Sequence, residues 1–297
     1  MKNPGRAALL TGCGLAVWAA AAAAQNLSPA ATDLNAIVAR MQSSLKVNGM
    51  LAEQYTSDEL WHNVNVNKDG KTTVDESAKY ENVFVEGLPY RRKVDENGKP
   101  LAGKAAAEEE KRYKKAVEER RTMSVAEKRG LLHRTSHWSL PICCLTTLFD
   151  NRVTGEAMVN GRKILVVEST PRAGAQAASP EEATALNWKE TTWIDQEDHL
   201  PVRLEAEALE KTGMMLKGST MRLDWERLPP SPEDSSGQAV WVEEGFVSHF
   251  QMKTMFMTFR GTTEETYSNY RKFHVDVRLL DDSMEPAPEM PPAGQPR

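Results

Sequence analysis

Apolar and polar side chains alternate along three segments in the second half of the chain. Residues 202–208 place Val, Leu and Ala on one side and Arg and Glu on the other, and residues 221–226 and 272–279 repeat this pattern. Because successive side chains of a β-strand point to opposite faces, each segment predicts a strand with one buried and one solvated face. Strands of this kind are typical of antiparallel sheets.

Other extended segments, rich in β-branched and aromatic residues, are separated by turn signals. Asp69-Gly70 and Asn160-Gly161 are dipeptides that favour tight turns between paired strands. The expected strands include residues 50–66, 72–85, 89–94, 153–159, 163–170, 188–195, 201–209, 218–228, 240–250, 252–259 and 262–279. We therefore expect an α+β, mainly β fold, in which nine or ten strands drawn from these segments form one large curved antiparallel sheet and a few helices cover its apolar face.

A helix is expected before the first strand. Residues 30–45 place Leu34, Val38, Met41 and Leu45 at helical spacing. The period changes after residues 47–49, where we expect the helix to have ended. Residues 171–185 and 229–237 are rich in small residues and proline, and they predict loops.

A charged helical insertion is expected at about residues 102–132. Its first part consists largely of Ala, Glu, Lys and Arg, which favours a solvated helix with ion pairs four residues apart. Glu108 with Arg112 and Glu110 with Lys114 have this spacing. A second helix is expected to begin at Ser124, because Ser124 and Glu127 form a capping-box pattern.

The first 24 residues resemble a secretory signal. Lys2 and Arg6 precede an uncharged, Ala-rich stretch that ends in Ala24 before Gln25. A membrane anchor is one alternative, because 18 apolar residues lie at the lower limit for a span. Lipid attachment at Cys13 is another, because residues 10–13 resemble a lipobox. We expect cleavage and export to the periplasm.

Composition and charge restrict the function classes. The chain carries 37 Lys and Arg against 42 Asp and Glu, without a long basic run. This balance argues against nucleic-acid binding, which requires clustered cations to neutralise phosphates. Residues 281–297 contain five prolines and predict a disordered tail. We expect one domain over residues 25–280.

Two motifs suggest metal binding, and each has a simpler interpretation. A calcium-loop spacing is formed by Asn65, Asn67, Asp69, Gly70 and Glu76. The segments beside it read as strands rather than helices, so a plain hairpin is favoured. His133 and His137 are four residues apart, but a zinc site needs a third ligand and the sequence offers no obvious one. We therefore expect no metal and no cofactor.

The three cysteines do not form a disulfide framework. Cys143 and Cys144 are adjacent, and a vicinal disulfide would strain the intervening peptide. A strained disulfide, two buried thiols and an intermolecular bond are the alternatives. The apolar neighbours Ile142, Leu145 and Leu148 favour buried thiols.

Apolar residues give a better functional indication than the polar ones. The chain contains neither a nucleophile elbow nor a phosphate-binding loop, and most carboxylates are expected on solvated faces. Methionine and phenylalanine cluster within residues 252–259, and such flexible side chains suit adaptable apolar surfaces. A single curved sheet under few helices can leave an incompletely filled cavity. The expected lining is Val202, Leu204, Met221, Leu223, Trp225, Met255, Met257 and Phe259.

Two hairpins carry a resemblance to a known superfamily. The segment GRKILVVESTPR, residues 161–172, resembles the strand followed by TPK/R in outer-membrane lipoprotein-sorting (LolA/LolB-like) proteins. The segment from TWID at residues 192–195 to LPVRLE at residues 200–205 resembles their "WID…LPVRxE" hairpin. Residues 87–101 and 267–273 resemble a largely uncharacterised secreted bacterial branch. The similarity spans about residues 45–279 and implies an unclosed half-barrel whose helices cover an apolar cavity.

This resemblance implies a non-catalytic periplasmic carrier that holds a lipid or a lipoprotein acyl chain. Membrane contact would be peripheral or transient, and no nucleic acid would bind. One alternative is an envelope interaction or sensing module, with a filled barrel and a protein partner for the charged helix. A weaker alternative is a hydrolase or metal enzyme that uses His133 and His137.

Overall fold

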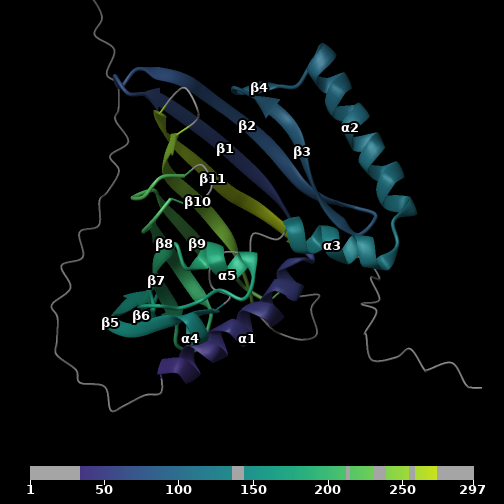
Figure 1. Cartoon of the computed structure of the whole chain (residues 1–297). Helices are drawn as coiled ribbons and strands as arrows, with labels where there is room; N and C mark the ends of the chain where they lie inside the picture. The colour runs from purple at the N-terminus through teal and green to yellow at the C-terminus, as the bar shows by residue number, and fades with distance from the viewer. Residues whose placement is uncertain (1–33, 136–143, 212–214, 231–238, 254–257, 273–297) are drawn as a thin grey trace, which may run out of the picture. The chain divides into compact units, whose positions relative to one another are not determined.

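The computed structural model describes residues 34–135, 144–211, 215–230, 239–253 and 258–272. Within them, one antiparallel sheet has the strand order β4-β3-β2-β1-β11-β10-β9-β8-β7-β6-β5 (Figure 1). The strands are β1 (Tyr55–Asn67), β2 (Thr72–Val85), β3 (Leu88–Glu96), β4 (Lys99–Pro100), β5 (Phe149–Val159), β6 (Arg162–Pro171), β7 (Trp188–Asp195), β8 (Pro201–Ala208), β9 (Thr220–Leu228), β10 (Val240–Lys253) and β11 (Thr258–Lys272). Because β4 and β5 stand at opposite ends of this order, the sheet is open. The expected fold class is confirmed.

The helices lie against both faces of the sheet. They are α1 (Leu34–Ala52), α2 (Gly103–Thr122), α3 (Val125–Thr135), α4 (Leu145–Leu148) and α5 (Pro180–Ala185). Helix α1 contacts β10, β5 and α4, whereas α2 and α3 contact β3 (Figure 1). No helix among the described residues has the length and apolar character needed to cross a membrane.

Strand register shows which face each helix covers. Residues that pair directly across neighbouring strands lie on the same face of the sheet. Leu204 of β8 pairs with Leu223 of β9, and Leu223 pairs with Phe246 of β10. Through β11, the same face continues to Trp61 of β1. The first three of these residues belong to the core beneath α1. Tyr90, which contacts α2, lies on the opposite face by strand alternation. The apolar face is therefore covered by α1 and α4, while α2 packs on the other side.

The main core lies between α1 and the strands from β5 to β10. Val38, Met41 and Leu45 of α1 are buried there, as the helical spacing predicts. The cluster of buried residues is completed by Cys144, Leu145, Phe149, Leu165, Val167, Ala185, Ile194, Leu200, Leu204, Leu223, Trp225 and Trp241. A smaller cluster contains Trp188, Ala206 and Ala208, with Met215 and Met221 packed against it.

The tight turns follow the sequence signals. Asn97-Gly98 and Asn160-Gly161 both have positive φ angles at each residue, 54° and 74° in the first pair and 50° and 78° in the second. Asn and Gly tolerate this left-handed region, which a two-residue hairpin turn requires. The hairpin β1–β2 also forms as predicted, and the side-chain oxygen of Asn67 accepts bonds from the backbone N–H groups of residues 69 and 71.

Several boundaries differ from the sequence prediction; β1, for example, begins at Tyr55 rather than at residue 50. Helix α1 continues to Ala52 instead of ending near residues 47–49, because Asn48 is buried and bonded to another element. The predicted break between residues 250 and 252 is absent, because β10 runs unbroken from Val240 to Lys253, and residues 258–259 belong to β11. The segment 171–185 contains the short helix α5, whose N-terminus is capped by the hydroxyl of Ser179.

The charged helix α2 is attached to the sheet by polar and aromatic contacts. The Tyr90 hydroxyl donates to Glu109 at 3.0 Å, and the Arg120 guanidinium lies 5.3 Å from the Tyr90 ring centre. Arg112 pairs with Glu109 rather than with Glu108, so this predicted ion pair is wrong, whereas Lys114 with Glu110 is confirmed. Helix α3 begins at the predicted capping box, in which Ser124 and Glu127 exchange hydrogen bonds.

Candidate functional site

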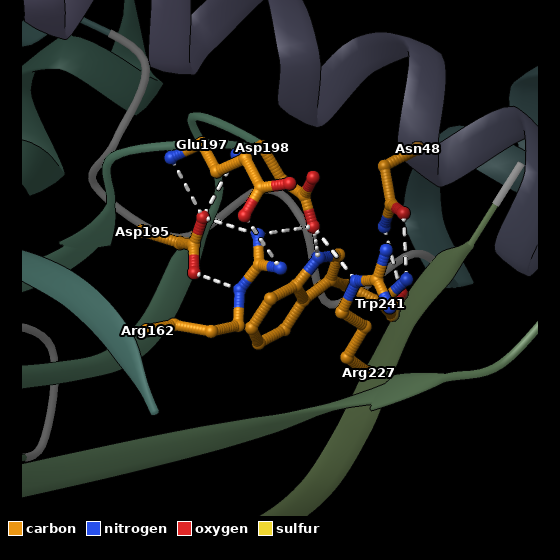
Figure 2. Close-up of polar contacts among 7 residues, drawn as sticks. All are labelled: Asn48, Arg162, Asp195, Glu197, Asp198, Arg227 and Trp241. Atoms are coloured by element: carbon orange, nitrogen blue, oxygen red, sulfur yellow. Dashed lines mark hydrogen bonds and ion pairs between the residues drawn. The ribbon is translucent and has the colours of Figure 1, made fainter. Parts of the chain in front are cut away.

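The turn between β7 and β8 carries a buried acidic side chain. Asp195 is fully buried, and Arg162 of β6 donates to both of its carboxylate oxygens (Figure 2). One of these oxygens also accepts the backbone N–H groups of residues 197 and 198, at 2.9 and 2.8 Å. Burial raises the pKa of Asp195, but the bonds from Arg162 and the backbone outweigh it and hold the pKa below its ordinary value.

Asp198, in the same turn, joins three strands. One carboxylate oxygen accepts Arg162 at 3.0 Å, Arg227 of β9 at 2.9 Å and the indole N–H of Trp241 of β10 at 2.9 Å (Figure 2). Charge-assisted hydrogen bonds are stronger than neutral ones. The two aspartates therefore fix the turn against the ends of β6, β9 and β10.

Asn48 attaches α1 to the same region. Its side-chain amide donates to the Trp241 carbonyl at 2.7 Å and accepts from the Trp241 N–H at 2.8 Å (Figure 2). Asn48 is 3% exposed, so these bonds are shielded from water. Because the Asn48 amide bonds to both the N–H and the carbonyl of Trp241, it holds α1 at a fixed distance from β10.

Replacing Asn48 with alanine is expected to lower the free energy of unfolding by about 2 kcal/mol, because two buried backbone groups lose their partner. Urea denaturation followed by circular dichroism measures this change. Asn35 is exposed on the first turn of α1 and provides the matched control, since its replacement by alanine removes no buried bond. Equal stability of the two variants would contradict the role of Asn48.

A pocket of about 300 Å³ lies beside this polar network. It is lined by Ser43, Ser44, Val47, Asn48, Asp198, Leu200, Arg227, Ala239 and Trp241. Leu200 and Trp241 also belong to the main core, so the apolar part of the pocket is continuous with that core. Val47 is 47% exposed at the helix surface. The pocket thus combines an apolar floor with an arginine and two serine hydroxyls.

A second pocket, of about 400 Å³, lies on β1, β10 and β11. Among its lining residues, His249 and Thr262 have side chains 3.0 Å apart and satisfy each other. None of its lining residues belongs to either core cluster. The pocket beside α1 is therefore the better candidate for a ligand with an apolar part.

The structure separates the residues that the sequence predicts to line a cavity. Leu204, Leu223 and Trp225 are buried in the main core, and Val202 packs against it. The other described members are Met221, which packs against the smaller cluster, and Phe259, whose ring stands 6.3 Å from that of Phe250. Met255 and Met257 lie outside the described residues. Neither pocket is lined by any of the six that the structure describes, so the contact of all eight with a ligand stays a prediction.

The other candidate chemistry is only partly described. Cys144 is 4% exposed and belongs to the main core, whereas Cys143 and His137 lie outside the described residues. His133 lies within α3, and nothing of its side chain is described. Among the described residues, no three His, Cys, Asp or Glu side chains gather as metal ligands would.

The sequence predicts the segments that carry the polar network but not the network itself. Arg162 lies in the first hairpin that carries the family resemblance, and Asp195 lies in the second. Nothing in either segment indicates that the two side chains meet, or that Arg227 and Trp241 join them. The only signal was the polar turn at residues 196–199, which interrupts two extended segments.

Comparison with known proteins returned similar solved structures but no match by sequence. No protein-family model and no curated protein matches the chain. Similar structures include a DUF1329 family protein from Desulfovibrio piger, with 12% identity, coverage of 82% of this chain and 94% of that one, and a TM-score of 0.32. A putative outer membrane lipoprotein-sorting protein domain from Vibrio parahaemolyticus has 11% identity, coverage of 82% and 95%, and a TM-score of 0.35.

A LolA superfamily protein from Nitrosomonas europaea is also similar, with 10% identity, coverage of 79% and 94%, and a TM-score of 0.29. Lipoprotein-sorting and LolA superfamily proteins, which the two hairpins resemble in sequence, are thus among the solved structures similar to this chain.

Proposed function

We propose that this chain is an exported, non-catalytic binding protein that holds the acyl chain of a lipid or lipoprotein in the pocket beside α1. The observation that carries this proposal is the continuity between the pocket and the main core through Leu200 and Trp241. An acyl chain that enters there extends an existing apolar surface. Each buried methylene group contributes about 0.8 kcal/mol, so a long chain needs few polar contacts.

The charged residues at the pocket support a binding role over a catalytic one. Asp195, Asp198 and Arg162 are bonded to one another and to the backbone, and they hold the turn in place. A general acid or base must instead reach the substrate with a proton to exchange. Export from the cell rests on the signal-like residues 1–24, which lie outside the described structure.

Native mass spectrometry of the mature chain, purified gently from the bacterial envelope, tests this proposal. We expect a co-purifying mass that is released as a lipid or acyl peptide on extraction. An apo mass, together with no uptake of added fatty acid, would contradict the carrier function.

Filling the pocket provides the matched test by mutation. Ser44→Phe places an aromatic ring among the lining residues, and we expect the affinity for a fluorescent fatty acid to fall by about tenfold or more because the ring occupies the apolar volume. Asn35→Phe adds the same ring at an exposed position of α1 and should leave the affinity unchanged. Titration of both purified variants, with melting curves to verify folding, measures the difference. Equal affinities would place the ligand elsewhere.

The filled main core favours a second candidate, an interaction module without a lipid. Leu204, Leu223 and Trp225 are 5% exposed or less, so these three members of the predicted lining pack within the core. The charged helix α2 would then offer a partner surface, with Lys114 and Lys115 more than 70% exposed. Absence of lipid uptake, combined with capture of an envelope protein that is lost in Lys114→Glu/Lys115→Glu, would favour this function.

A further inference from the structure

Among the described residues, the guanidinium of Arg227 bonds to a carboxylate through its Nε atom and offers its two terminal amino groups to the pocket. Its Nε donates to Asp198 at 2.9 Å, and the side chain is 37% exposed. Within the described part of the chain, the contacts of Arg227 with carboxylates involve Nε alone. The two terminal amino groups of a guanidinium fixed in this way form a planar fork that matches a carboxylate or a phosphate.

Asp198 accepts two further hydrogen bonds besides the one from Arg227. The same carboxylate receives Arg162 at 3.0 Å and the indole N–H of Trp241 at 2.9 Å. Arg162 and Arg227 together balance the charges of Asp195 and Asp198, and Glu197, which faces Arg162, is 76% exposed to solvent. An incoming anion therefore meets a positively charged fork without a buried and uncompensated carboxylate beside it.

Helix α1 adds further positive charge to this side of the pocket. Its sequence contains Arg40 and Lys46 and no acidic residue. Arg40 approaches the ring of His199, in the same turn as Asp198, at 3.4 Å. Ser44, one turn after Arg40, contributes a hydroxyl to the pocket wall. Helix α1 thus contributes two cations and no anion, although the chain as a whole has a formal charge of −5.

We propose that the pocket selects amphiphiles with an anionic head group, a carboxylate or a phosphate monoester, and that Arg227 is the residue that contacts this group. The inference rests on the proposed function, because the apolar chain of the ligand occupies the volume against Leu200 and Trp241. Arg40 and Lys46 attract the anion at longer range.

Four probes of defined chemistry test the inference by calorimetric titration of the mature chain. Dodecanoate and dodecyl phosphate carry the two anionic head groups, dodecyl maltoside carries a neutral one, and inorganic phosphate has no chain. We expect Arg227→Gln to weaken both anionic amphiphiles by about tenfold, since a charge-assisted bidentate contact is lost. Binding of dodecyl maltoside should change by less than about twofold.

Arg222→Gln is the matched control. Arg222 lies on the same strand but on the opposite face, where it pairs with Asp224. Its replacement should leave all four affinities unchanged. Arg227→Lys keeps the charge without the fork, and we expect a smaller loss for the anionic probes than with glutamine.

The outcomes separate this inference from the proposed function. Equal weakening of the neutral and anionic probes, or no weakening by Arg227→Gln, would overturn the head-group role while the carrier function stands. Inorganic phosphate that binds as tightly as dodecyl phosphate would overturn the requirement for a chain. Failure of the wild-type protein to bind any of the three amphiphiles would overturn both.

Discussion

Replacement of Glu190 by glutamine is expected to stabilise the folded protein at alkaline pH and to leave it nearly unchanged at acidic pH. Glu190 lies on β7, is fully buried, and has no hydrogen-bond partner for either carboxylate oxygen among the described residues. Complete burial raises its pKa to about 8, because a surrounding of low polarity disfavours the charged form. In the folded protein at neutral pH the side chain is therefore mostly protonated.

The direction of the pH dependence follows from the unfolded chain, in which Glu190 ionises near its ordinary pKa of 4.5. Between pH 4.5 and pH 8 the unfolded state releases a proton that the folded state keeps, so the free energy of unfolding falls as the pH rises. A pKa difference between 4.5 and about 8 corresponds to about 5 kcal/mol. This contribution is fully present below pH 4.5 and is lost above pH 8.

Urea denaturation of wild type and Glu190→Gln at several pH values from 4.5 to 9 measures this effect. We expect the two proteins to agree within about 1 kcal/mol at the acidic end, because both side chains are then neutral. The variant should be more stable by about 5 kcal/mol at pH 9. Glu205→Gln, at an exposed position of the neighbouring strand β8, is the control and should follow the wild-type profile. If the free energies of unfolding of wild type and Glu190→Gln differ by the same amount at every pH, Glu190 does not change its protonation on unfolding.

The sequence could predict the sheet because its information is local. Alternation at residues 202–208 identifies a half-buried strand without knowledge of its neighbours, and Leu204 and Ala206 are indeed buried while residues 205 and 207 are exposed. The Asn-Gly turns likewise depend on two residues with positive φ. Such features specify which residues form strands and which strands form hairpins.

Some carboxylates lie on a buried face of the sheet, and local sequence patterns could not predict these cases. Residues 188–195 include two carboxylates, which the sequence places on solvated faces by default. In the structure Trp188, Glu190, Thr192 and Ile194 share the buried face, and Asp195 is fully buried as well. The strand has too few apolar residues to reveal which side is buried, and only the packing of other elements against it decides.

The candidate pocket depends on contacts between residues that are far apart in the chain. Asn48 and Trp241 are 193 residues apart, and Asp198 and Trp241 are 43 apart. A single sequence shows the residue types but not these pairs. For the same reason the sequence places the end of α1 too early. The apolar period changes after residues 47–49, but the bonds from Asn48 to Trp241 hold this part of the chain within the helix.

Replacement of Arg162 by methionine is expected to lower the free energy of unfolding by about 3–5 kcal/mol, because it leaves a buried charge without its partner. The Arg162 side chain is 20% exposed, whereas that of Asp195 is fully buried. The hydrogen bonds to Asp195 raise the pKa of Arg162 above its ordinary value, although desolvation acts in the opposite direction. The raised pKa means that the pair stabilises the charged forms of both side chains. Methionine preserves much of the side-chain volume, so the loss reports the charge rather than the packing.

Arg152→Met is the matched control for this change. Arg152 pairs with Glu168 at 2.8 Å, but its side chain is 72% exposed, and an exposed pair contributes about 1 kcal/mol or less. Urea denaturation at neutral pH, analysed with a common slope, compares the two variants. Equal losses for Arg162→Met and Arg152→Met would contradict the role of Arg162 as the compensating charge.

The double variant Arg162→Met/Asp195→Asn separates charge compensation from geometry. Asparagine at position 195 can still accept the backbone N–H groups of residues 197 and 198, but it carries no charge. We therefore expect the double variant to be more stable than Arg162→Met alone by about 2 kcal/mol. The pKa of Asp195 lies below its ordinary value of 3.8, so the wild-type advantage is fully present above pH 3.8 and is lost as the pH falls through the lower folded value. The difference in the free energy of unfolding between wild type and Arg162→Met should accordingly become smaller in acid. If this difference instead becomes larger in acid, Asp195 is not ionised in the folded protein.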